Sequence, residues 1–150
     1  MVTKKDLLKN IKNDTYCKIG VSKIHGVGVI AIKEIPKGVN PFVSLYSTME
    51  FIIFHDTDFD QLDPAITKYI KSFFVRTKKE YPIMLGGLNS IGVFGYINHS
   101  DKPNMELSFE SMTELCPFLA IRDIKVGEEL FWDYRTSGGD DLKNQYPFLK

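Results

Sequence analysis

The sequence predicts a β-rich α+β domain built from several small sheets, with a short N-terminal helix and one longer central helix. Three observations lead to this fold class. Most apolar runs are short and end near glycine or proline. Helical periodicity is clear in only two segments of the chain. A strand–turn unit also occurs twice, as AIKEIPKG at 31–38 and AIRDIKVG at 120–127.

The N-terminal helix is predicted over residues 3–13. Leucine and isoleucine recur there at helical spacing, and Thr3 with Asp6 three positions later has the spacing of a capping box. The following segment, 27–32, carries apolar residues on both sides of an extended chain. We therefore expect a strand that is buried on both faces.

The central helix is predicted over residues 64–77. Asp63 and Pro64 suit the N-cap and first turn, and apolar residues then follow at the spacing of one helix face. The glycine-rich stretch after Pro82 is expected to be irregular. Further strands, rich in β-branched and aromatic residues, are predicted at 42–46, 50–54, 105–109, 117–121 and 129–134.

The two similar segments share four identical positions and keep the charge of two others. Each reads as a strand end, a charged turn, an isoleucine that returns to the core, and a glycine. We interpret them as recurrence of a favourable strand–turn unit rather than as a true repeat.

Composition narrows the function classes. The chain has 150 residues, of which 43% are hydrophobic and 25% charged, so disordered and fibrous classes are excluded. The net charge is zero, which gives no general attraction to nucleic acid or to an anionic membrane. Residues 1–40 carry eight lysines against three acids, whereas 106–150 carry nine acids against five bases. This acidic region either favours a cationic substrate or is a solvated face.

No metal site is expected. Cys17 and Cys116 are far apart and have no Cys or His at ligand spacing, so reduced thiols in a reducing compartment are predicted. The acidic loop at 56–60 resembles a calcium loop, but Gln61 and Thr67 replace the required Gly and Glu. The chain shows no signal peptide and no membrane-length apolar run, and we expect a soluble protein of the cytoplasm or nucleus.

Three segments carry candidate chemistry: HGVG at 25–28, NHSDKPN at 98–104 and GEELFWDY at 127–134. Each alone has an ordinary interpretation as a bend, a turn cluster or a strand end. The first is not a dinucleotide fingerprint, because a third glycine and a following helix are missing.

Together and in this order, the three segments resemble the SET domain, the family of S-adenosylmethionine-dependent protein lysine methyltransferases. The resemblance covers about residues 16–134 and is closest to minimal SET proteins of the virus or bacterium type. It implies a SET-like fold of small sheets, in which the segment after Tyr134 crosses the Asn-His-Ser loop in a knot-like arrangement. Residues 1–15 would be a helical extension, and 135–150 a tail without a zinc cluster.

The resemblance also implies a cofactor site. The family's G-x-G stretch falls on Gly26, Val27 and Gly28, where the backbone would approach S-adenosylmethionine and a bulky side chain would not fit. The family's Asn-His pair falls on Asn98 and His99, which would hold the adenine and amino-acid ends of the cofactor.

The family's catalytic tyrosine falls on Tyr134, and Trp132 and Tyr96 would line the substrate channel. Methyl transfer to an amine depends on positioning and on the local field more than on acid–base catalysis. Tyr134 would therefore orient the reacting groups. Aromatic walls would accept the lysine stem and favour its cationic head.

The chain departs from the family pattern in three places. Trp132 stands where Phe or Tyr is common; pointing into the channel it would favour low methylation states, and packed into the core it would impose no limit. The arginine common before the Asn-His pair in histone-directed members is missing. No Cys-x-Cys cluster follows Tyr134, so the tail, the substrate or a second subunit would close the channel.

The predicted function is S-adenosylmethionine-dependent methylation of a lysine side chain in a protein or peptide, with a flexible, basic segment as target. The alternative is a non-catalytic SET-fold module for protein binding or oligomerisation. No nucleic acid or membrane partner is expected. A homodimer is predicted because a chain this small buries a limited core.

Overall fold

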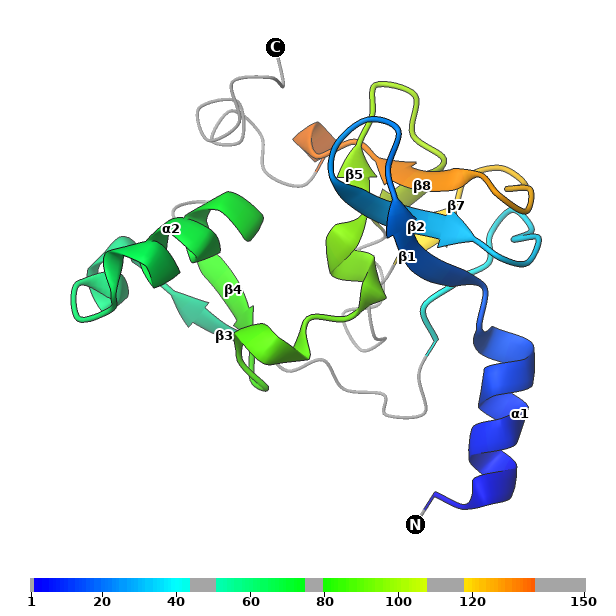
Figure 1. Ribbon diagram of the computed structural model, residues 1–150, viewed down its shortest axis with the longest axis horizontal. Coiled ribbons are helices and arrows are strands. Elements are labelled where there is room, and N and C mark those ends of the chain that lie inside the picture. The colour runs from blue at the N-terminus through cyan, green and yellow to red at the C-terminus, as the bar shows by residue number, and fades with distance from the viewer. Residues whose placement is uncertain (1, 44–50, 75–79, 108–117, 137–150) are drawn as a thin grey trace. The chain divides into compact units, whose positions relative to one another are not determined.

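The computed structural model describes residues 2–43, 51–74, 80–107 and 118–136. The chain forms two compact units. The first comprises Met1–Met49 with Ile91–Asp133, and the second comprises Glu50–Ser90 with Tyr134–Lys150. Short strands in three small sheets and two α-helices make up the described part (Figure 1), which confirms the predicted β-rich α+β class.

The first unit is organised around a four-stranded sheet with the order β1-β2-β8-β5. Its strands are β1 (Cys17–Val21), β2 (Val27–Ala31), β5 (Asn98–His99) and β8 (Glu129–Trp132). β2 pairs antiparallel with both β1 and β8, whereas β5 pairs parallel with β8. A separate antiparallel pair joins β6 (Met105–Leu107) to β7 (Phe118–Ala120). Segments far apart in the sequence therefore meet at β8 (Figure 1).

The N-terminal helix α1 spans Lys4–Asp14, and its predicted capping box is confirmed. The Asp6 amide donates to the Thr3 hydroxyl (3.2 Å), and the Thr3 amide donates to the Asp6 carboxylate (3.0 Å). The Thr3 hydroxyl also donates to the Asp6 carboxylate (2.6 Å), and this bond together with the one from the Thr3 amide lowers the pKa of Asp6. No residue of α1 is buried, so packing does not hold it. At its other end, Lys33 Nζ donates to the Asn13 carbonyl (2.7 Å), where a cation also complements the helix dipole.

The prediction that the 27–32 strand is buried on both faces holds only for its middle, where Gly28 and Val29 on opposite faces are both buried and Ile30 is half-buried. Val29 is fully buried, but Val27 is 47% exposed and Ile32, which lies beyond the end of β2, is 44% exposed. The strand extends past the core at its first residue, where its cross-strand neighbour Val21 is 86% exposed. The preceding strand β1 was not predicted, although Cys17, Ile19 and Val21 alternate regularly with Lys18 and Gly20.

The two similar strand–turn units pair with one another. Ile35 and Ile124, which occupy equivalent positions, form an antiparallel bridge and are both completely buried. The glycine that ends each unit, Gly38 or Gly127, has a positive φ that favours glycine. Around this bridge lies the core of the first unit, which contains Val29, Ala31, Ile35, Ile97, Met105, Phe118, Ala120, Ile124, Leu130 and Trp132.

The second unit contains a two-stranded sheet and the helix α2. The strands β3 (Phe51–Phe54) and β4 (Tyr81–Met84) pair antiparallel, and α2 spans Pro64–Phe73. Short 3₁₀ turns occur in this unit at Asp56–Phe59 and Leu88–Ser90, and in the first unit at Val93–Tyr96. The core of the second unit consists of Phe59, Ile70, Tyr81 and Ile83, packed by Phe54, Phe74 and Leu88.

The start of α2 is as predicted, but its end is not. Asp63 Oδ1 accepts a hydrogen bond from the Ala65 amide (2.7 Å), and Pro64 occupies the first turn. The helix ends at Phe73 rather than 77, because Phe74 takes an extended conformation and packs into the core of its unit. Residues 75–77 lie outside the described residues.

Several strand predictions are confirmed; β7 and β8 end earlier than predicted, and residues 50, 108, 109 and 117 of the predicted segments lie outside the described residues. β3, β6, β7 and β8 fall within the predicted segments 50–54, 105–109, 117–121 and 129–134. In the predicted strand 42–46, Phe42 instead lies in a turn, where its amide donates to Asn40 Oδ1 (2.9 Å); residues 44–46 lie outside the described residues. β4 was not predicted, and its Pro82 is tolerated because β4 pairs on one side only within the described part of the chain.

Two further predictions concern parts that the structure does not fully describe. The knot-like crossing involves the segment after Tyr134, of which 137–150 lie outside the described residues. The boundaries 1–15, 16–134 and 135–150 also stay predictions. Neither α-helix in the described part has the length and apolar run that crossing a membrane requires.

Candidate functional site

The HGVG segment forms the end of the β1–β2 turn. Ser22 Oγ accepts hydrogen bonds from the amides of Ile24 and His25, at 3.0 and 3.1 Å, and the Ser22 amide donates to the Gly26 carbonyl. Gly26 has a φ of 56°, a left-handed conformation that favours glycine. A Cβ on Gly26 would meet no atom within 4 Å. The backbone conformation, and not crowding, therefore explains this glycine.

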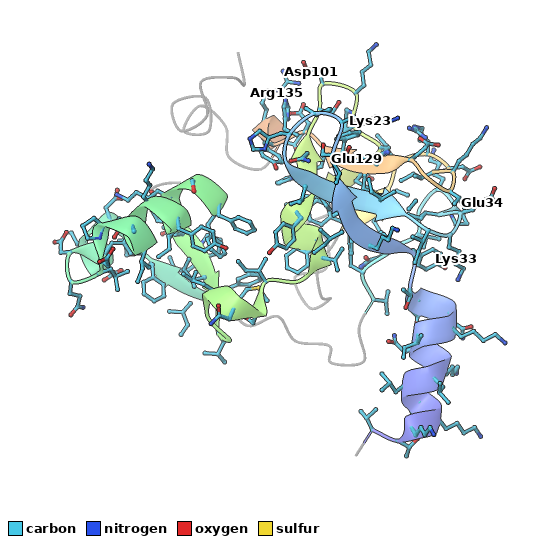
Figure 2. The ribbon with its side chains drawn as sticks, viewed as in Figure 1. Lys23, Lys33, Glu34, Asp101, Glu129 and Arg135 are labelled. Atoms are coloured by element: carbon cyan, nitrogen blue, oxygen red, sulfur yellow. The ribbon has the colours of Figure 1, made fainter. Side chains whose placement is uncertain are left out.

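Gly28 is explained by crowding. Its φ lies outside the left-handed region, but a Cβ at this position would overlap the carboxylate of Glu129. That Cβ would lie 2.8 Å from Glu129 Cδ and 3.1 Å from Asn98 Nδ2. Both side chains thus occupy the space that glycine leaves open on this face of β2. Figure 2 labels Glu129 on β8, which pairs with β2.

Asn98 lies on β5, beside Phe131 of β8. Its Nδ2 donates toward three acceptors: the Val27 carbonyl (2.9 Å), Glu129 Oε1 (3.0 Å) and the His25 carbonyl (3.3 Å). The reverse orientation of the amide would place Oδ1 against three acceptor oxygens, so the chemistry fixes the orientation. Among the described residues, no group donates a hydrogen bond to Asn98 Oδ1.

His99 lies between two carboxylates. Its Nε2 is 3.6 Å from Asp101 Oδ1, and its Nδ1 is 3.7 Å from Asp133 Oδ1. These separations are too long for hydrogen bonds, so the two carboxylates flank the ring without hydrogen bonding to these nitrogens. The His99 and Asp133 side chains are largely buried, whereas Asp101 is 77% exposed. With Glu129, three carboxylates therefore lie on the motifs that carry Asn98 and His99.

Asn104 holds β8 beside the Asn-His-Ser loop. Its Oδ1 accepts from the Phe131 amide and its Nδ2 donates to the Glu129 carbonyl, both at 2.8 Å. Its own amide donates to the Phe131 carbonyl (3.1 Å). Since Asn104 is only 1% exposed, these bonds satisfy a buried amide that would otherwise be costly. The loop and the strand are thereby fixed to each other.

The five residues predicted to bind the cofactor lie in the segment 26–28 and on β5. The structure brings Gly28, Asn98 and His99 together with β8, and the Gly26 carbonyl closes the adjacent turn. Val27 contributes its carbonyl to Asn98. Sequence reasoning assigned no role in this network to Glu129 or to Asn104, although both lie in the motifs. A glycine in a regular strand, at Gly28, was the signal that could have pointed to Glu129.

The predicted site also includes three aromatic residues, of which Trp132 lies on β8 beside His99. Trp132 is 8% exposed and packs edge-on against Phe118, with 5.1 Å between ring centroids. Tyr96 ends a 3₁₀ turn of the first unit and is half-buried. Tyr134 is also half-buried and belongs to the second unit. Their roles in channel and catalysis stay predictions.

No group of three His, Cys, Asp or Glu side chains with the arrangement of metal ligands occurs in the part of the chain that the structure describes. The described carboxylates near Asn98 are separate, and the one on Glu129 is engaged by the Asn98 amide. The arrangement instead suits a polar, cationic ligand. A hydrogen-bond acceptor at Asn98 and neighbouring carboxylates would both favour an ammonium group.

Comparisons with known proteins agree on one family. A family model described as the SET domain matches residues 26–135. The probable histone-lysine N-methyltransferase set-23 of Caenorhabditis briggsae is 43% identical over 53 residues, which are 32% of this chain and 22% of that protein. The match therefore spans about a fifth of that relative's length.

A solved structure from Plasmodium falciparum, described as a candidate histone methyltransferase, is also similar. It covers 80% of this chain and 93% of its own, with 16% identity and a TM-score of 0.48.

Proposed function

This chain belongs to the SET-domain family, and from that premise we propose that it transfers methyl groups from S-adenosylmethionine to a lysine side chain of a protein. The observation that carries the proposal is the Asn98 amide. Three acceptors hold its nitrogen, and its oxygen accepts no hydrogen bond from the described residues. Asn98 is half-buried. A half-buried oxygen that accepts no hydrogen bond from these residues is suited to an N–H donor from a ligand.

The residues around Asn98 fit the cofactor that the family implies. Asn98 Oδ1 would accept a hydrogen bond from its ammonium group, and the carboxylates of Glu129 and Asp133 would favour its net positive charge. The Gly26 turn offers backbone without a covering side chain. When bound, S-adenosylmethionine supplies an electrophilic methyl group on a sulfonium. Asn98 and His99, which the pairing of β5 with β8 fixes in place, would hold it.

On the substrate side, the proposal assigns orientation to Tyr134. Its hydroxyl can accept a hydrogen bond from a lysine amine and direct the nitrogen lone pair, which in-line transfer requires. A desolvated lysine loses its proton more easily, so a water-poor channel would favour the neutral nucleophile. Trp132 and Tyr96 are proposed as aromatic neighbours of this channel.

The proposed target is a lysine in a flexible, basic segment. Residues 106–150 carry nine acids against five bases, and complementary charge speeds association and disfavours acidic competitors. The name of the curated relative mentions histones, which are proteins of this general kind. A basic peptide is therefore the first substrate to test.

The test combines binding and transfer. Calorimetry with S-adenosylmethionine and with its demethylated product should show binding to the wild type and none to an Asn98→Ala, His99→Ala double variant. Tritiated methyl groups should then appear on lysine-rich proteins. Binding without transfer to any substrate would support the alternative, a non-catalytic binding module. Absence of binding by folded wild type would refute the proposal.

A further inference from the structure

Glu129 is the residue that links the glycine turn to the Asn-His pair. It lies on β8 opposite Ile30 of β2, and its Oε1 accepts a hydrogen bond from Asn98 Nδ2 at 3.0 Å. The three elements that supply Glu129, Asn98 and Gly28 come from distant parts of the sequence. All three belong to the first unit.

The Asn98 amide has more acceptors than hydrogens. Its nitrogen carries two hydrogens and lies within hydrogen-bond distance of two carbonyls and one carboxylate. A charged acceptor makes a stronger bond than a carbonyl does. Of the three acceptors, Glu129 therefore contributes most to the position of Asn98 Nδ2. Because the amide group is planar, this also directs Asn98 Oδ1 to the opposite side.

Gly28 makes this arrangement sterically feasible. The overlap that a Cβ would create involves the end of the flexible Glu129 side chain, and no backbone atom lies among its nearest neighbours. Replacing Gly28 with alanine should therefore displace the carboxylate and leave the sheet intact. The conformation of Gly28 gives no other reason for a glycine, since its φ is not in the left-handed region.

We propose that Glu129 is a positioning residue that orients the Asn98 amide for the cofactor, and that Gly28 is a glycine because it admits the Glu129 carboxylate. The inference rests on the proposed function, because it takes S-adenosylmethionine as the ligand of Asn98. Glu129 acts through Asn98 and also adds a negative charge beside a cationic ligand.

The experiment measures cofactor affinity by calorimetry in the full chain for Glu129→Ala, Glu129→Gln, Gly28→Ala and the Gly28→Ala, Glu129→Ala double variant. Loss of a charge-assisted hydrogen bond should weaken binding by about tenfold in Glu129→Ala. Glu129→Gln should bind with intermediate affinity, since its amide oxygen can still accept. Gly28→Ala should match Glu129→Ala. The double variant should be no weaker than either single variant, because both changes remove the same interaction.

Glu128→Gln is the matched control. The Glu128 carboxylate is held by Arg122 and by the Lys125 amide, both at 2.8 Å, and these contacts lower its pKa. Neutralising it removes the same charge one residue away without touching Asn98. Its cofactor affinity should equal that of the wild type. If it instead weakened binding as much as Glu129→Gln does, general electrostatics would explain the effect and the positioning role would be refuted.

A second readout needs no cofactor. The side-chain amide protons of Asn98 should shift in the NMR spectra of Glu129→Gln and Gly28→Ala alike, while thermal unfolding shows that each variant is folded. If the wild type binds the cofactor and the Glu129→Ala and Gly28→Ala variants bind it equally well, the inference alone is overturned. If the folded wild type binds no cofactor, the proposed function is overturned and the inference with it.

Discussion

Ile35 and Ile124 exchange backbone hydrogen bonds: the Ile35 amide donates to the Ile124 carbonyl (3.0 Å), and the Ile124 amide donates to the Ile35 carbonyl (2.9 Å). The surrounding contacts repeat the same symmetry. The Gly38 amide donates to the Ala120 carbonyl (2.7 Å), and the equivalent Gly127 amide donates to the Ala31 carbonyl (2.8 Å). The two similar segments are thus related by an approximate twofold arrangement within one chain.

This arrangement predicts equal stability losses at the two isoleucines. Both side chains are completely buried, so Ile35→Ala and Ile124→Ala should each lower the free energy of unfolding by about 2–5 kcal/mol. Urea unfolding measures both values. Ile19→Ala, at a residue that is 44% exposed, is the control and should cost much less. A large loss at only one of the two isoleucines would show that the segments are not energetically equivalent.

Tyr134→Phe should separate binding from transfer. The substitution removes only the hydroxyl that is proposed to orient the lysine amine, so methyl transfer should fall by at least about a hundredfold. Cofactor affinity should change little, because the proposed cofactor contacts lie at Asn98 and His99. Single-turnover transfer and calorimetry on the same preparation provide the two values. Full transfer activity in this variant would remove Tyr134 from the mechanism.

Trp132→Phe distinguishes the two interpretations of this side chain. Its edge-on packing against Phe118 favours the core interpretation. The variant should then lose about 1–3 kcal/mol of stability, as for partial removal of a buried side chain. Its ratio of mono-, di- and trimethyl-lysine products should match that of the wild type by mass spectrometry. A shift toward higher methylation would instead assign Trp132 to the channel.

Cys17 should react slowly with alkylating reagents. Burial raises the pKa of its thiol from 9.0 to about 11, which lowers the thiolate fraction about a hundredfold at neutral pH. The rate of alkylation in a Cys116→Ser variant should rise with pH until about 11. A rate equal to that of a free cysteine in the native protein would contradict this.

The same shift has a consequence for stability. Because the folded pKa lies above the unfolded one, the unfolded chain releases the proton first as the pH rises. The contribution of Cys17 to stability is present below pH 9.0 and is lost progressively as the pH rises toward about 11. A Cys17→Ala variant should show a weaker decline in melting temperature over this range.

Local signals were sufficient for the ends of the elements that depend on local chemistry. The Thr3 and Asp63 caps are side-chain hydrogen bonds to amides two or three residues away, and the sequence alone contains both partners. The end of α2 was mispredicted because packing of Phe74 into the core overrides the helical spacing. Strand β5 has only two residues, and its partner on β8 defines it.

In the candidate site, too, some features follow from local sequence and others depend on tertiary contacts. The family motifs predicted Asn98, His99 and the glycines as cofactor-binding residues, and the structure brings Gly28, Asn98 and His99 together with β8. The sequence could not separate the reasons for the glycines, since a left-handed turn at Gly26 and a crowded strand at Gly28 look alike in one dimension. Likewise, the side-chain hydrogen bonds of Asn104 run to backbone atoms 25 or more residues away.

The hydrogen bonds between Asn104 and β8 determine when the site can form during folding. Asn98 and Asn104 contact β8 across long stretches of intervening chain, and such non-local closures are slow compared with helix formation. During synthesis, the glycine turn and the Asn-His pair leave the ribosome well before residues 129–132. Until β8 emerges, the Asn-His-Ser loop has no strand with which to form hydrogen bonds. A nascent chain that ends before Gly127 should therefore be unable to bind the cofactor.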